Sequence, residues 1–285
     1  MIPEKILSLL VCPACKGKLD AGEGFSCRGC RATYEVVGDV PHLLDEKRKE
    51  GKQDLSRTFE FKSSLRNSRI FKALKYIFGA DFVPRDPLRQ FNDLFLNKAG
   101  TGGLVLNMGS GSTRLAEGVV NMDIEHLPNV DIVADGSRLP FPPGVFDAVI
   151  SEAVIEHVKD PGAFVSELKR VLKKGGVVFI VAPFVHHFHA YPNDFQRYSL
   201  EGLKVLFKDF DEMESGVYRG PSVALVNFLS EYAASLFCSK PSLRLFLKSL
   251  FTLFLFPVKF LDLFLNKRAD AFVLAHCVYY IGKKR

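Results

Sequence analysis

The chain has 285 residues, of which 47% are hydrophobic, and its formal net charge is +6. This length provides one full α/β core with a small attached module, and it excludes two ordinary large domains. The charge permits acidic partners without demanding them. The first ten residues contain a short apolar run and no small-residue cleavage site, so we expect a protein of the reducing cytoplasm.

Two Cys-x-x-Cys pairs lie near the start of the chain, in CPACKGKLDAGEGFSCRGC. This spacing is typical of structural zinc sites, in which each pair supplies two thiolates. Two disulfides are the alternative, which a reducing compartment disfavours. Because four thiolates close the coordination shell, we expect one structural Zn²⁺ that folds the module and does no chemistry. Its predicted ligands are Cys12, Cys15, Cys27 and Cys30.

The stretch ATYEVVGDVPHLL follows and predicts a short strand, a turn at Gly38-Asp39 and a second apolar segment. The order of an apolar helix, CPxC, CxxC, Tyr34 and GDVPHLL resembles the small zinc-ribbon proteins that activate RNA and protein methyltransferases as a separate subunit. It resembles, less closely, the zinc finger of large-subunit rRNA guanine methyltransferases. We therefore expect a zinc-ribbon module at 1–46, whose target could be RNA, protein or nothing.

A basic helical linker is expected at 47–100. Its first part, 47–75, is rich in Lys and Arg interleaved with Phe and Leu.

From Leu104 the chain alternates apolar runs with turns, as in an open parallel sheet. A helix is predicted at Pro161 to Lys173. We expect an α/β fold: a Rossmann-like, doubly wound, mostly parallel sheet occupying 101–220 and 269–285. The predicted strands lie in LVLNM, GVVNMDI, VDIVAD, FDAVISE and GVVFIVAP, followed by DEMESGVYRG and AFVLAHCVYYIGKK.

Residues suited to ligand binding follow four of these strands, and ligands of such sheets bind at the carboxyl ends of the strands. Gly109 and Gly111 allow close approach of the backbone, and Asp123 can accept both hydroxyls of a ribose. No third glycine opens a long helix, which argues against a dinucleotide site. The candidate cofactor residues are Asn107, Gly109, Gly111, Asp123, Asp135, Gly136 and Ser151.

The segments VLNMGSGST, NMDIE, VADGSRLPFPPGVFDAVISEAVIEHVKDP and LKRVLKKGGVVFIVAP resemble class I S-adenosylmethionine-dependent methyltransferases of the small-molecule group. The resemblance covers about residues 100–185. It implies that Gly109 and Gly111 pass under the methionine part of S-adenosylmethionine and that Asp123 holds the ribose. It further implies that Asp135 and Gly136 flank the adenine and that Ser151 lies near the sulfonium.

Two departures from that family pattern matter. Asn107 stands where an acid is usual, and the short distance from Gly111 to the second strand leaves the usual first helix absent or reduced to one turn. Arg114 is a candidate cation for the cofactor's carboxylate in place of that helix terminus.

The segment PFVHHFHAYPNDFQRYSLEGLKVLF follows the fifth strand and supplies candidate acceptor-site residues. His187 and His189 are candidate general bases, with Asp194 as their orienting partner. Alternatively, the His and Asp side chains fix the loop by hydrogen bonds while Tyr191 and Tyr198 pack. A second metal site is disfavoured, because the HHxH spacing lacks a partner set. The segment resembles the HxxPxDxxRYS motif, followed by GL, of methyltransferases from bacterial cell-surface glycan loci.

An apolar helical insertion is expected at 221–268. A narrow polar stripe recurs there at near-helical spacing, formed by Arg244, Lys248, Thr252, Lys259, Asp262 and Asn266. The longest uncharged run, 249–258, is half of what a membrane span requires. An interfacial helix, a dimer contact and a lid over the acceptor pocket are the alternatives, and the basic residues favour a membrane surface.

Together these patterns predict a cytoplasmic methyltransferase, peripheral at the inner face of the membrane, that uses S-adenosylmethionine. Its expected acceptor is a small molecule, a glycan or a lipid-linked compound. The alternatives are an RNA methyltransferase that binds phosphate with the zinc ribbon and the basic segment 47–75, or a non-catalytic adaptor that retains the cofactor fold. A homodimer through 221–268 is a further alternative.

Overall fold

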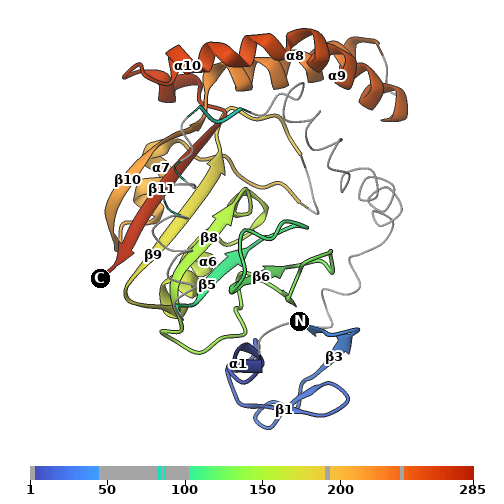
Figure 1. Ribbon diagram of the computed structural model, residues 1–285, viewed down its shortest axis with the longest axis vertical. Helices are drawn as coiled ribbons and strands as arrows, with labels where there is room; N and C mark the ends of the chain where they lie inside the picture. The colour runs from blue at the N-terminus through green and yellow to red at the C-terminus, as the bar shows by residue number, and fades with distance from the viewer. Residues whose placement is uncertain are drawn as a thin grey trace.

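The computed structural model describes residues 4–44, 82–84, 87, 91, 103–189, 193–237 and 241–285. Most of the predicted linker 47–100, including the basic segment 47–75, lies outside the described residues, as does Tyr191. Figure 1 shows the N-terminal module at one end of the molecule and a layer of helices at the opposite end.

The sheet has eleven strands in the order β1-β2-β3-β4-β7-β6-β5-β8-β9-β11-β10. The first four are antiparallel and form the N-terminal module after the short helix α1, Glu4–Leu7. They are β1, Leu19–Ala21; β2, Phe25–Cys27; β3, Thr33–Val37; and β4, Val40–Leu43.

The central strands run parallel from β4 to β9, as the repeated apolar runs predicted. Pairing of Met108 with both Met122 and Ser151 brings the ends of β5, β6 and β8 level with one another. The glycine turn, Asp123 and Glu152 therefore lie along one edge. The strands are β5, Val105–Met108; β6, Val119–Asp123; β7, Ile132–Ala134; β8, Phe146–Glu152; and β9, Leu172–Pro183.

Two antiparallel strands complete the sheet: β10, Phe210–Arg219, and β11, Cys277–Lys284. The last strand was predicted to begin at Ala271, but residues Ala271–Leu274 form the short 3-10 helix η3. Strand β11 begins where its residues enter the buried space between β9 and β10, since Cys277 pairs with both Pro183 and Arg219.

Helix α6, Pro161–Val171, covers one face of the sheet. Its start is fixed by Asp160, whose side chain accepts a hydrogen bond from the N–H of Ala163, and by Pro161 in the first turn. Phe164 and Leu168 are fully buried on its inner side. Helix α7, Leu200–Leu206, lies beside it, and Phe91 packs on the opposite face against Phe179.

The N-terminal module is built into the main domain. Strand β4 pairs in parallel with β7, where His42 lies opposite Val133 and Leu43 opposite Ala134. Ile6 and Tyr34 belong to the same buried apolar cluster as the central strands. The module therefore shares a sheet and a core with the cofactor edge.

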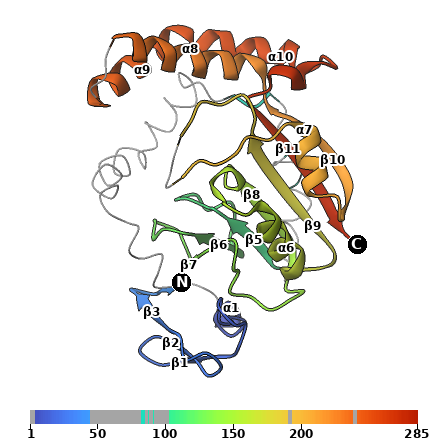
Figure 2. The same cartoon turned by 180° about the vertical axis from the view of Figure 1, so that it is seen from behind.

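A layer of helices lies across the end of the sheet toward which β9 points (Figures 1 and 2). Among the described residues, no helix has the length and apolar character needed to cross a membrane. The layer consists of α8, Pro221–Phe237; α9, Pro241–Leu255; η2, Phe256–Leu261; and α10, Asp262–Leu265.

The polar stripe predicted in this insertion turns toward the protein. Lys259 and Asp262 are buried, and Asp262 accepts hydrogen bonds from the N–H groups of Ser222 and Val223 at the start of α8. The large apolar side chains on the remaining circumference are exposed, among them Phe228, Tyr232, Phe237, Phe246, Phe254 and Phe264.

Candidate active site

The turn after β5 carries the two glycines of the predicted cofactor site. Gly109 and Gly111 have φ angles of +70° and +54°, a region that glycine adopts readily. A Cβ on Gly109 would lie 2.1 Å from Cγ2 of Val154, so this position has no room for a side chain. A Cβ on Gly111 would meet no atom of the described residues within 4 Å. The space beside Gly111 is therefore open to a ligand.

Asp123 ends β6 directly beside this turn. Its Oδ2 accepts a hydrogen bond of 2.8 Å from the N–H of Gly111, and its Oδ1 accepts one of 3.0 Å from the N–H of Glu125. Each carboxylate oxygen has a second lone pair that can accept a ribose hydroxyl. Burial raises the pKa of Asp123 from its ordinary value. These contacts fix the predicted ribose acceptor in place.

Asp135 follows β7 and lines a cavity of about 850 Å³ between the sheet edge and the N-terminal module. Ser137 and Arg138 line the same cavity, and Arg31 and Tyr34 contribute from the module. The module thus forms one wall of the space next to the predicted adenine position.

Gly136, the predicted neighbour of the adenine, packs closely against the core of the protein. A Cβ there would lie 3.0 Å from both Sδ of Met108 and Cε2 of Phe164. Glycine at this position lets the loop after β7 pack closely against β5 and α6.

Ser151 and Glu152 end β8. Ser151 is only 1% exposed and lies level with Met108 inside the sheet. Glu152 is half-buried, and one of its carboxylate oxygens accepts a hydrogen bond of 3.2 Å from the Tyr218 hydroxyl. Of these two residues, Glu152 is therefore the more accessible at the edge.

Asn107 and Arg114 belong to a polar network beneath the glycine turn. The buried side-chain amide of Asn107 donates to Oδ1 of Asn121, whose own amide donates to backbone carbonyls of Thr113 and Asn129. No helix forms at 111–118, as expected. Arg114, the candidate cation for the cofactor carboxylate, instead forms an ion pair of 2.6 Å with Asp131. This polar network lies next to residues 111–118, where the family pattern usually has its first helix.

The four N-terminal cysteines meet in space. Their Sγ atoms lie within 4.8 Å of one another, with Cys12–Cys30 and Cys15–Cys27 distances of 3.6 and 3.4 Å. A tetrahedral zinc ion with Zn–S bonds of about 2.3 Å separates its sulfur ligands by roughly 3.8 Å. A Cβ on Gly17 would lie 3.1 and 3.2 Å from two of these sulfur atoms. The cluster therefore fits a structural zinc ion.

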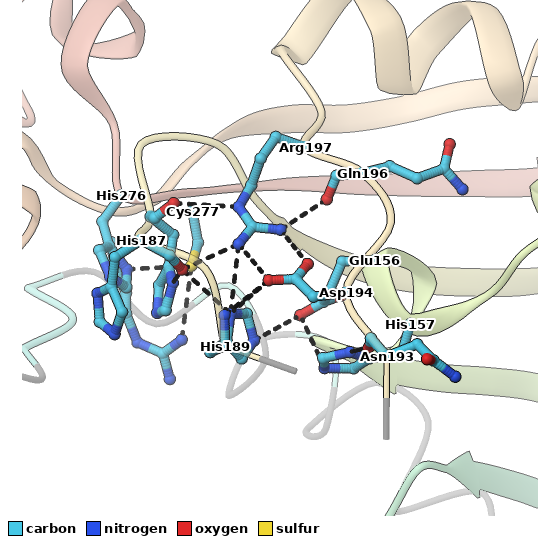
Figure 3. Close-up of polar contacts among 12 residues, drawn as sticks. Glu156, His157, His187, His189, Asn193, Asp194, Gln196, Arg197, His276 and Cys277 are labelled. Atoms are coloured by element: carbon cyan, nitrogen blue, oxygen red, sulfur yellow. Dashed lines mark hydrogen bonds and ion pairs between the residues drawn. The ribbon is translucent and has the colours of Figure 1, made fainter. Parts of the chain in front are cut away.

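The loop after β9 gathers the predicted acceptor-site residues (Figure 3). Asp194, whose side chain is 1% exposed, forms a bidentate pair with Arg197 and accepts a hydrogen bond from the N–H of His189. The Arg197 guanidinium holds the pKa of Asp194 well below its usual range. Arg197 also donates to the backbone carbonyls of His186 and His187, so this pair holds the loop together.

His187 and His189 point in different directions from this loop. Nε2 of His187 lies 3.3 Å from Nζ of Lys248, and burial together with this cation lowers the pKa of His187 to about 4. Nδ1 of His189 lies 3.5 Å from Asp194. A base with a pKa near 4 is weak at neutral pH, which argues against His187 as the general base.

Two functional candidates missed in the sequence, Glu156 and His157, lie on the 3-10 helix η1, Ile155–His157. Glu156 is fully buried, and neither of its carboxylate oxygens has a hydrogen-bond partner among the described residues. Its Oε1 lies 3.7 Å from Nε2 of His157 and 3.5 Å from Nε2 of His189. The signal available in the sequence was a Glu-His pair inside the apolar stretch AVIEHV, directly after a strand end.

Residues 107–180 match the family described as methyltransferase domain. The chain contains a methyltransferase domain. A ubiquinone biosynthesis O-methyltransferase of Caulobacter vibrioides is 36% identical over 76 residues, which are 26% of this chain and 27% of that protein. The chain thus spans about a quarter of this relative. A solved phosphoethanolamine N-methyltransferase 2 of Haemonchus contortus is 20% identical, with a TM-score of 0.44, covering 78% of this chain and 59% of that one.

A second family matches a smaller fraction of the chain. UPF0434 proteins of Nitrosococcus oceani and Colwellia psychrerythraea are 34% and 39% identical over 50 and 49 residues. The matches span 16% of this chain and 85% and 75% of those short proteins. Over this stretch the chain belongs to the UPF0434 family. The chain therefore contains both a methyltransferase domain and a segment similar to UPF0434 proteins.

Proposed function

We propose that this protein transfers a methyl group from S-adenosylmethionine to a small-molecule, glycan or lipid-linked acceptor. The observation that carries the proposal is the open space beside Gly111, next to a fixed Asp123 carboxylate, within the methyltransferase domain. Asp123 would hold the ribose hydroxyls and Asp135 would lie beside the adenine. The bound cofactor would supply an electrophilic methyl group on a sulfonium.

The UPF0434-like segment is proposed to be the N-terminal module, which binds one structural zinc ion. Its share of the chain equals the size of that module. Lys16 supports this role, since its Nζ donates to the carbonyl of Leu139 and pairs with Glu167 on α6 at 2.8 Å. The module would brace the loop after β7 and with it the adenine end of the cofactor site.

The helical layer is proposed to hold the enzyme on a lipid surface and to cover the acceptor loop. Its exposed face is apolar, while Glu231 on α8 pairs with Arg244 and Lys248 on the inner side. Because Arg244 and Lys248 share an acidic partner and Lys259 is buried, the charge attraction to anionic lipid is weaker than the sequence suggested. Burial of apolar side chains remains as the source of lipid affinity.

The test is a methyl-transfer assay with labelled S-adenosylmethionine and three separate acceptor pools: membrane lipid extract, soluble metabolites and total RNA. The proposal expects label in the lipid or metabolite pool, and lipid vesicles should stimulate the first. Label in RNA alone would favour the RNA methyltransferase. Binding of the cofactor without transfer to any pool, in a mixture of all three, would favour the adaptor.

A further inference from the structure

We propose that Glu156, His157 and His189 bind a divalent transition-metal ion beside the acceptor loop. Their three ligand atoms lie within 4.8 Å of one another, and the Nε2 atoms of both histidines face Oε1 of Glu156 (Figure 3). Ligands about 2.0–2.1 Å from a tetrahedral ion are roughly 3.3 Å apart. The observed separations of 3.5 and 3.7 Å from Oε1 are close to that value, and the two histidine nitrogens lie within 4.8 Å of each other.

Glu156 provides an independent reason to expect a ligand. The side chain is fully buried, and both oxygens lack a hydrogen-bond partner among the described residues. A buried carboxylate without hydrogen bonds is costly, and a bound cation removes that cost. The Arg197 guanidinium nearby forms its hydrogen bonds with Asp194 and backbone carbonyls, and it acts on Glu156 only through its charge.

The second nitrogen of each histidine is held in the way metal-binding histidines require. Nδ1 of His157 lies 2.5 Å from the carbonyl oxygen of Asn193, which accepts its proton and leaves the Nε2 lone pair free. Nδ1 of His189 lies 3.4 Å from the carbonyl oxygen of His187, 3.4 Å from Nη2 of Arg197 and 3.5 Å from the Asp194 carboxylate. A carbonyl or carboxylate behind the ligand fixes the tautomer and orients the ring.

The donor set selects the class of ion. Two imidazoles and one carboxylate suit Zn²⁺, Fe²⁺, Co²⁺ or Mn²⁺, whereas Mg²⁺ and Ca²⁺ prefer oxygen ligands throughout. Three protein ligands leave coordination positions open, unlike the closed four-cysteine site. The two sites of the chain are therefore chemically distinct.

The metal site lies next to the cofactor turn, so the ion can activate the methyl acceptor; this role rests on the proposed function. Val154 packs over Gly109 in the cofactor turn, and Glu156 and His157 follow it after one intervening residue. An acceptor hydroxyl bound to the ion loses its proton to water more readily. Its oxygen then attacks the methyl carbon; the O–C bond forms as the C–S bond breaks, and sulfur keeps the electron pair as a thioether. His189 would then hold the ion rather than accept a proton.

The experiment is a Co²⁺ titration of the full metal-free chain, followed by absorption spectroscopy. We expect two equivalents: one with intense thiolate charge-transfer bands from the cysteine site, and one with only the weak bands of nitrogen and oxygen ligands. His189→Ala should lose the second equivalent and keep the first. His187→Ala is the matched control from the same loop and should keep both.

Asp194→Asn should weaken the second equivalent by about 10- to 100-fold through its effect on His189. The charge-transfer bands report in every sample that the N-terminal module is folded, and a parallel titration with S-adenosylmethionine tests the proposed function separately. Uptake of one equivalent by the wild-type chain would overturn the metal site. Retention of the second equivalent in a folded His189→Ala chain would overturn it as well.

Discussion

The Nζ atom of Lys248 on α9 lies 3.3 Å from Nε2 of His187 in the loop after β9. The same ammonium pairs with Glu231 on α8 at 2.8 Å. A helical layer whose outer face is apolar therefore reaches the acceptor loop through its inner polar side chains. A surface that binds the outer face would therefore contact helices whose inner side chains touch this loop.

Lys248→Met should raise the pKa of His187 from about 4, because the substitution removes a cation and leaves Glu231 nearby. The value should stay below the ordinary 6.5, since burial is the larger cause and persists. Titration of the imidazole by NMR measures this shift. Arg244→Met, which removes a cation that pairs with Glu231 and not with His187, should raise the pKa of His187 less or leave it unchanged, because it only frees part of the Glu231 charge.

Asp123→Ala should weaken binding of S-adenosylmethionine by roughly 10- to 100-fold, corresponding to about 1.5–3 kcal/mol for charge-assisted hydrogen bonds to the ribose. Calorimetry measures the affinity. Glu125→Ala makes the same charge change two residues away and should have little effect. Equal affinity in Asp123→Ala and the wild-type chain would remove Asp123 from the site.

Cys12→Ser should abolish zinc binding and also weaken cofactor binding, because β4 shares its sheet with β7 and the module shares its core with β5. Metal analysis, thermal unfolding and cofactor titration check this prediction together. Arg28→Ala removes an exposed ion pair with Asp20 in the same module and should change none of them. A chain that lost zinc but bound the cofactor normally would show that the module is independent.

Phe254→Asp combined with Phe264→Asp should release the protein from lipid vesicles, because both side chains are at least 70% exposed on the apolar layer. Each contributes roughly 1.5–3 kcal/mol when buried in lipid. Flotation with zwitterionic and anionic vesicles should give similar results, since Arg244 and Lys248 are paired within the protein.

Val205→Asp is the control for this pair, because Val205 is exposed on α7 outside the layer. If the double substitution instead turned a dimer into a monomer and lipid had no effect, the layer would be a subunit interface.

Asp194→Asn should destabilise the native state at pH 7 by about 3 kcal/mol or more, because it leaves the Arg197 guanidinium without its buried partner. The folded-state pKa of Asp194 is depressed, so its contribution is present above the unfolded pKa of about 3.9 and is lost as the pH falls through the folded value. Denaturant unfolding at several pH values should therefore show a difference between variant and wild type that shrinks below about pH 4. Asp20→Asn, on an exposed ion pair, should show little difference at any pH.

The sequence by itself determined the parallel sheet and its ligand-binding edge. Apolar runs of strand length recur between turns, and the carboxyl ends of parallel strands lie at one edge of a sheet. The sequence alone therefore predicts that Gly111 and Asp123 lie close together. The cysteine spacing determined the metal cluster in the same way, because each Cys-x-x-Cys pair closes locally. These are short-range patterns, and the structure confirms the sheet and the grouping of the four sulfur atoms.

Only the tertiary structure decided which distant side chains meet. Glu156 and His189 are far apart in sequence, and their contact depends on how η1 and the loop after β9 fold over the sheet edge. The period of the polar stripe in the insertion predicted helices but not their orientation, and Lys248 and Asp262 face inward because partners on other elements compensate their burial. Pairing of β4 with β7 likewise depends on docking of the module. The hydrophobic periodicity of a segment indicates its own secondary structure. Which other segment it packs against depends on side-chain packing and charge compensation across the whole chain.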